Sequence, residues 1–138
     1  MVALYSIKPI YSNQIITGTK KYEIRKKIPA KIPDYIVIYS SSPESRVIGY
    51  AEVKNILERS VARLWEEVAG HAGITRKAYE EYFSGRSVGY AIELGNVKRF
   101  IRPFKLGEIS ASCVPPQSFS YISKQDFNRI KRRKTQDV

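Results

Sequence analysis

The sequence predicts a single α+β domain built around a small, curved β-sheet or barrel. The chain has 138 residues, a length that fits one domain and allows a genuine hydrophobic core. Five to seven short β-forming segments run along it, and two helical segments interrupt them near the middle. No repeat or linker divides the chain. We therefore expect one domain over residues 1–123, followed by a basic helix or tail over residues 124–138.

The first half of the chain predicts four strands and one short helix. Alternating polar and apolar residues at 22–25 suit a strand with its polar side chains on one face. Residues 35–39 are uniformly β-forming and should be buried on both sides. Gly49 predicts a bulge or a close approach of neighbouring backbone. The expected strands are 2–7, 22–25, 35–39 and 47–53, with helical turns at 10–17.

The second half predicts two helices followed by three strands. Ser60 and Thr75 can each cap the N-terminus of a helix, and glycines follow both helical segments. The pair Gly95-Asn96 is a candidate two-residue turn that would join antiparallel strands at 87–94 and 97–103. A last strand is expected near residues 119–122, before the basic C-terminal residues.

The net charge of +11 is concentrated in three segments. Residues 18–33, 98–105 and 124–138 carry net charges of +5, +4 and +4, so the rest of the chain is slightly acidic. Concentrated positive charge favours a polyanionic partner, because each phosphate contact releases condensed counterions. RNA or a nucleotide is therefore the expected partner, with a surface of simply solvated lysines as the alternative.

Composition also excludes several classes of protein. One cysteine, Cys113, allows no intrachain disulfide, which indicates a reducing compartment and a cytoplasmic location. His71 is the only histidine, so a closed zinc site is excluded. A carboxylate-bound magnesium site is the open alternative, but no acidic cluster indicates one, and we expect neither a metal nor another cofactor. No apolar run approaches the ~20 residues of a membrane helix, and the first residues do not read as a signal peptide.

A specific motif lies between Gly18 and Arg25. The segment Gly-Thr-Lys-Lys-Tyr-Glu-Ile-Arg matches the pattern G-x-K-x-x-E-x-R, whose polar positions are Lys20, Glu23 and Arg25. Together with the segments 4–9, 38–43 and 115–119, it makes the chain resemble the ASCH domains, a branch of the PUA-like proteins. The resemblance implies a β-barrel of about six strands with flanking helices. It also implies a cleft, beside the helix that precedes Lys20, that binds RNA.

The motif supplies the candidate centre of the site. Glu23 and Arg25 should project from the same face of their strand. Lys20 and Arg25 would then meet a phosphate or a carbonyl group, and Glu23 would accept from a base or act as a general base. The alternative is a structural Glu–Arg ion pair that closes the barrel.

Other polar residues lie at strand ends or in the segments that resemble the family. The predicted RNA- or nucleotide-binding residues are Lys8, Lys20, Arg25, Tyr39, Ser40, Ser41, Gln117 and Ser118, and the predicted catalytic residues are Lys20 and Glu23. Tyrosines 5, 11 and 90 are candidates for stacking on bases, with packing as the alternative for each.

Three functions fit these residues. The first is an RNA-binding domain that holds single-stranded RNA or a nucleotide in a basic cleft. The second is a hydrolase: either a metal-independent ribonuclease using Lys20, Tyr39 and Ser118, or an enzyme similar to the ASCH relatives that remove N4-acyl groups from cytidine. In those relatives a threonine stands where this chain has Glu23, and their glutamate lies at the start of the helix before Gly85, where residues 74–77 of this chain contain no acid. These two departures put an identical mechanism in doubt. The third is a regulatory domain that senses a nucleotide-like ligand.

Overall fold

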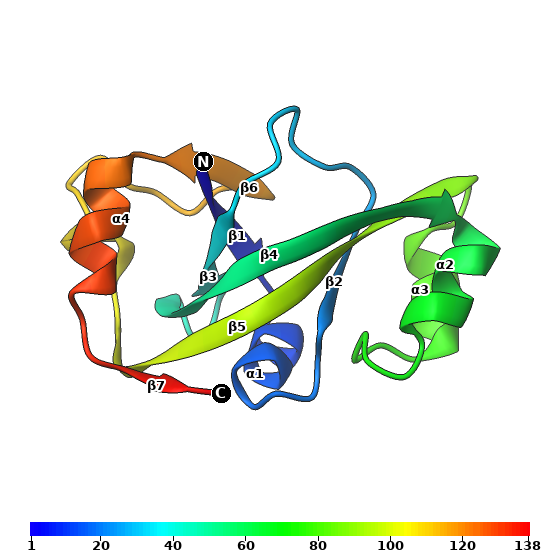
Figure 1. Ribbon diagram of the computed structural model, residues 1–138, viewed down its shortest axis with the longest axis horizontal. Helices are drawn as coiled ribbons and strands as arrows, with labels where there is room; N and C mark the ends of the chain where they lie inside the picture. The colour runs from blue at the N-terminus through cyan, green and yellow to red at the C-terminus, as the bar shows by residue number, and fades with distance from the viewer.

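One mixed sheet of seven strands and four α-helices make up the computed structural model, which describes residues 1–138 (Figure 1). The predicted α+β class is confirmed. None of the helices has the length and apolar character that crossing a membrane requires. The helices are α1 (Pro9–Ile16), α2 (Val61–Val68), α3 (Arg76–Tyr82) and α4 (Lys124–Lys131). The strands are β1 (Val2–Ile7), β2 (Tyr22–Arg25), β3 (Tyr35–Ser40), β4 (Arg46–Ser60), β5 (Val88–Phe104), β6 (Phe119–Ile122) and β7 (Thr135–Asp137).

The strand order is β2-β5-β4-β3-β1-β6, and β7 pairs separately with β5. Only β1 and β3 are parallel, and all other pairs are antiparallel. The long strands β4 and β5 cross the whole molecule and carry α2 and α3 at one end (Figure 1). Because β2 and β6 end the strand order without pairing to each other, backbone hydrogen bonds do not close the barrel-like sheet.

Alternation along the strands separates two hydrophobic clusters. On β1, Leu4 packs with the α4 side of the sheet and Tyr5 with the α1 side. On β3, Val37 packs in the cluster on the α4 side and Ile36 in the cluster on the α1 side. This is the period of two that an extended chain imposes. The prediction that residues 35–39 are buried on both sides is therefore confirmed for residues 36–39, and α2 and α3 cover a third cluster.

The predicted turn at Gly95-Asn96 is wrong. Strand β5 runs through both residues to Phe104 and stays paired with β4 on either side of them. The register between β4 and β5 shifts on both sides of Val53, which lets the pairing continue past Gly95 and Asn96. Asn96 Nδ2 donates to Glu52 Oε1 at 3.5 Å. Pairing along most of two long strands outweighs the local preference of a Gly-Asn pair for a turn, because strand stability depends on cross-strand contacts.

Gly49 marks a close backbone approach, as the sequence predicts. A Cβ atom at this position would lie 2.5 Å from the Lys98 carbonyl oxygen of β5, which is closer than real Cβ contacts come. The register between β4 and β5 also shifts between Val47 and Gly49. A glycine is required here by the neighbouring chain, since any side chain would push the two strands apart.

The C-terminal residues are ordered against the sheet. Ser123 caps α4, its Oγ accepting from the Asp126 N–H at 3.0 Å. Phe127 and Ile130 of this helix are buried in the cluster that includes β1 and β3. Strand β7 then pairs with β5, placing Thr135 opposite Phe100. Of the two predicted alternatives, a helix or a fraying tail, residues 124–131 take the helix.

Candidate nucleotide-binding pocket

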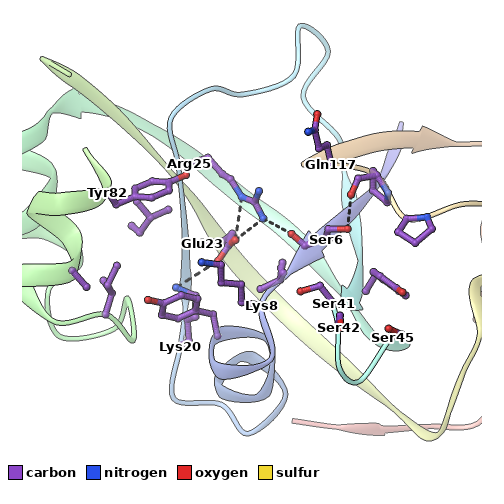
Figure 2. Close-up of a pocket in the computed structure, with 18 of the residues that line it drawn as sticks. Ser6, Lys8, Lys20, Glu23, Arg25, Ser41, Ser42, Ser45, Tyr82 and Gln117 are labelled. Carbon is purple, nitrogen blue, oxygen red and sulfur yellow. Dashed lines mark hydrogen bonds and ion pairs between the residues drawn. The ribbon is translucent and has the colours of Figure 1, made fainter. Parts of the chain in front are cut away.

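An open pocket of about 840 Å³ lies where β2, α1, α3, the turn after β3 and the segment before β6 meet. Its polar lining combines cations, carboxylates, tyrosines and serines from all five segments. Figure 2 shows many of these side chains directed into the same space. The polar lining residues are Ser6, Lys8, Tyr11, Lys20, Glu23, Arg25, Tyr39, Ser41, Ser42, Ser45, Glu81, Tyr82 and Gln117.

Lys20 is the most buried cation of the pocket. Its side chain is 3% exposed, and its Nζ donates to the Ala72 carbonyl oxygen and lies 3.5 Å from Glu23 Oε1. The ammonium group also lies 5.2 Å from the centre of the Tyr11 ring. Burial lowers the pKa of Lys20 from its ordinary value, while the Glu23 carboxylate opposes that shift. Lys20 therefore combines fixed placement with a proton that leaves more readily than that of an exposed lysine.

Arg25 and Glu23 form a charge-assisted fork. Arg25 Nη2 and Nε donate to Glu23 Oε2 at 2.7 and 3.1 Å. Arg25 Nη2 also donates to the Ser6 carbonyl oxygen at 3.1 Å, and Nη1 donates to Ser118 Oγ at 3.2 Å. Arg25 thus joins β2 to β1 and to the residue before β6, across the open ends of the sheet. This geometry favours the structural interpretation of the Glu–Arg pair.

Lys8 is the cation that remains free for a ligand. It follows β1 directly, precedes α1, and is exposed. No carboxylate lies within ion-pair distance of it. Figure 2 shows its side chain directed to the same space as Lys20 and Glu23. The pocket therefore contains an exposed, unpaired lysine and a buried, paired one.

Two walls of the pocket come from helices. Tyr11 of α1 lines it, and Tyr82 and Glu81 line it from α3. Burial raises the pKa of Tyr82, and Lys26 Nζ lies 4.8 Å from the centre of its ring. Tyr82 was not among the residues that the sequence predicted for the site. Its hydroxyl on an otherwise apolar helix face was the available signal, because a tyrosine hydroxyl needs a polar environment.

Most of the predicted site residues converge, and others do not. Ser40 is fully buried and its Oγ accepts from Ser12 Oγ at 2.8 Å, so it lies outside the pocket. Ser118 also lies outside and holds Arg25. Tyr5 is fully buried against Phe119 and Tyr90 is not part of the lining, so neither is placed to stack on a base. The predicted residues that share the pocket are Lys8, Tyr11, Lys20, Glu23, Arg25, Tyr39, Ser41 and Gln117.

Comparison with known proteins identifies the family. Residues 6–104 match the model of the ASCH domain. An ASCH domain-containing ribonuclease of Zymomonas mobilis is 31% identical over 132 residues, which are 93% of this chain and 88% of the relative. A crystal structure of ASCH from Zymomonas mobilis superposes with a TM-score of 0.89 and 29% identity, covering 98% of this chain and 96% of that one.

A more distant neighbour shares the fold alone. The N-terminal domain of Staphylothermus marinus McrB superposes with a TM-score of 0.58 at 13% identity, over 96% of this chain and 94% of that one. The matched segment of the ASCH model contains the motif from Gly18 to Arg25, with Lys20, Glu23 and Arg25 together at the pocket. The chain therefore belongs to the ASCH domain family.

Proposed function

We propose that this protein is a ribonuclease that binds single-stranded RNA in the pocket. The observation that carries the proposal is the combination of three cations and three tyrosines around one open space of about 840 Å³. That volume lies in the range of about 300–1,000 Å³ typical of small-ligand sites. Cations suit the phosphate, and tyrosine rings suit unstacked bases. The similarity to a relative named as a ribonuclease supports the same function.

The pocket has groups for cleavage by the RNA's own 2′-hydroxyl. That oxygen would attack the adjacent phosphorus while the bond from phosphorus to the 5′-oxygen breaks, leaving a 2′,3′-cyclic phosphate and a 5′-hydroxyl. Lys20 would stabilise the added negative charge of the pentavalent phosphorane. Tyr39 would relay the proton of the 2′-hydroxyl to solvent, water would protonate the departing 5′-oxygen, and Lys8 would hold the phosphate. Ser118 would position Arg25 instead of acting on the RNA.

Incubation with a fluorescent single-stranded RNA in the presence of a metal chelator tests the proposal. We expect fragments that end in a 2′,3′-cyclic phosphate and no cleavage of DNA of the same sequence. A single 2′-deoxy nucleotide should block cleavage at that position, because the attacking hydroxyl is missing. RNA that stays intact while bound to the protein would overturn the enzymatic proposal and leave RNA binding alone.

Amide hydrolysis of N4-acylcytidine is a second candidate, favoured by one observation. Glu81 of α3 lines the same pocket as Lys20 and supplies a carboxylate for proton transfer. Glu23 stands where relatives with this activity have a threonine, and its Oε2 already accepts from Arg25. Incubation with N4-acetylcytidine, followed by chromatography, should then release cytidine, and Glu81→Gln should stop the release. Unchanged substrate would exclude this activity.

Removing the ring of Tyr82 should weaken RNA binding if the ring stacks on a base. Tyr82→Ala is expected to raise the Kd for a short RNA by about five- to 150-fold, the equivalent of ~1–3 kcal/mol per stacked base. Tyr82→Phe keeps the ring and should bind almost as wild type does. Fluorescence anisotropy measures both variants, with Tyr121→Ala, outside the pocket lining, as the control. Wild-type affinity in Tyr82→Ala would contradict stacking.

A further inference from the structure

We propose that an exposed cationic surface outside the pocket binds the phosphate backbone of the same RNA strand. This β5–β7 surface consists of Arg99, Lys105 and Lys134. The inference rests on the proposed RNA function and deepens it, because a second phosphate-binding surface makes the protein prefer strands longer than the pocket can hold. The inference predicts that affinity increases with RNA length and that binding of long RNA weakens as salt is added.

The fold brings two basic segments together to form this surface. Residues 97–138 contain ten lysines and arginines against three acidic residues, so they carry +7 of the net charge of +11. Strand β7 pairs with β5, with Arg99 opposite Gln136, and the Ile101 N–H donates to the Lys134 carbonyl oxygen at 3.0 Å. Segments 35 to 39 residues apart therefore lie side by side, at the end of the molecule opposite α2 and α3 (Figure 1).

The surface keeps an excess of charge after its ion pairs are formed. Lys98 pairs with Asp137, Arg133 with Glu108 and Arg129 with Asp126, which accounts for all three carboxylates of this region. Arg99, Lys105 and Lys134 are exposed, and none of them forms an ion pair. Like charges left unpaired on neighbouring segments repel one another, and a polyanion relieves that repulsion.

The surface begins where the pocket ends. Ser45 lines the pocket, and Arg46, the next residue, starts β4. Arg46 Nη1 donates to the Glu44 and Ser45 carbonyl oxygens, and no carboxylate pairs with this guanidinium. Val47 lies opposite Phe104, so Lys105 follows directly beside the start of β4. An RNA strand leaving the pocket past Ser45 would therefore meet Arg46 and then Lys105. This continuity favours an RNA strand over a separate anionic surface such as a membrane.

Neutralising two of these cations tests the inference. The variant Arg99→Gln/Lys134→Gln is compared with Arg63→Gln/Lys77→Gln, which removes the same charge from exposed positions on α2 and α3. Anisotropy is measured with an RNA that only fills the pocket and with one several times longer, over a series of salt concentrations. Thermal denaturation of both variants verifies that each is folded as wild type is.

We expect the β5–β7 variant to bind the long RNA about tenfold more weakly. The slope of log Kd against log salt should decrease by about 1.4, or roughly 0.7 for each lost contact with a single strand. Affinity for the short RNA, and both affinities of the control variant, should stay unchanged. Equal losses for short and long RNA, no loss for either, or tighter binding to anionic lipid vesicles than to long RNA would overturn the inference. Wild-type protein that binds neither RNA would instead refute the proposed function.

Discussion

Replacing Lys20 with Met should reduce kcat/KM for RNA cleavage by about 10²–10³-fold, the usual cost of removing one preorganised group that stabilises transition-state charge. Met has a similar length but cannot carry the charge that the phosphorane requires. The effect should appear in kcat more than in KM, because Lys8 and the tyrosines still hold the substrate. Single-turnover cleavage of a fluorescent RNA measures the loss directly.

The same substitution removes two contacts inside the protein, so folding needs its own control. Lys20 Nζ donates to the Ala72 carbonyl oxygen and faces Glu23, and both partners lose a cation in Lys20→Met. Activity should therefore be measured well below the unfolding temperature of the variant. Lys124→Met, at an exposed position outside the pocket lining, is the matched control and should cleave RNA as wild type does. A kcat/KM for Lys20→Met within a few-fold of wild type would show that Lys20 is only structural.

The pKa of Lys20 adds a dependence on pH whose sign follows from its burial. Because burial lowers the pKa from 10.5, the ammonium form is lost at a lower pH in the folded protein than in the unfolded chain. The unfolded chain binds more protons in that interval, so the stability of wild type should rise with pH there. Activity that needs the ammonium form should fall over the same interval. In Lys20→Met, stability should no longer rise with pH through Lys20, and activity should no longer fall through it. Urea unfolding at several pH values measures the first effect, and a pH–rate profile measures the second.

Replacing Phe127 with Ala should lower the free energy of unfolding by about 3–5 kcal/mol, the usual cost of emptying a buried aromatic site. Phe127 is 4% exposed. The centre of its ring lies 5.2 Å from the ring centre of Tyr35 and 5.5 Å from that of Tyr50. For a domain of this size the loss corresponds to a fall in Tm of about 10–20 °C. Urea unfolding and thermal denaturation measure the two quantities.

Asn128→Ala is the control on the same helix, since Asn128 is exposed. It should change the free energy of unfolding by less than about 0.5 kcal/mol. A loss below about 1 kcal/mol in Phe127→Ala would mean that α4 packs only loosely on the sheet. Because α4 contributes Phe127 and Ile130 to the core, deleting residues 124–138 would destabilise the whole domain. Such a deletion therefore cannot isolate the contribution of the basic residues of α4 to RNA binding.

Local signals in the sequence predicted the elements whose stability is local. Ser60 and Thr75 cap α2 and α3 as expected, with Oγ and Oγ1 accepting from backbone N–H groups three residues later. The prediction failed at Gly95-Asn96, where pairing with β4 decides the conformation. Strand β7 was also missed, because three residues carry too little pattern and depend wholly on β5.

The same distinction applies to the site. Lys20, Glu23 and Arg25 lie within six residues, so their spacing alone placed them together. Glu81 and Tyr82 reach the pocket from α3, nearly sixty residues later, and no local pattern connects them to the motif. Ser40 was predicted in the site because it lies at a strand end, but its side chain is buried and hydrogen-bonded to Ser12. The alternation of β3 decides which face of the sheet its hydroxyl takes, and the position at a strand end does not indicate that face.

The curved sheet is completed by a side chain, because Arg25 connects β2 to β1 and to the residue before β6. A guanidinium carries five N–H donors, so it can exchange one acceptor for another without the loss of a backbone ladder. A phosphate that takes an Arg25 donor from the Ser6 carbonyl or the Ser118 hydroxyl would loosen the seam between these strands. RNA bound in this way would couple ligand occupancy to the local opening of the sheet through Arg25, so amide exchange in β6 should become faster when RNA is added.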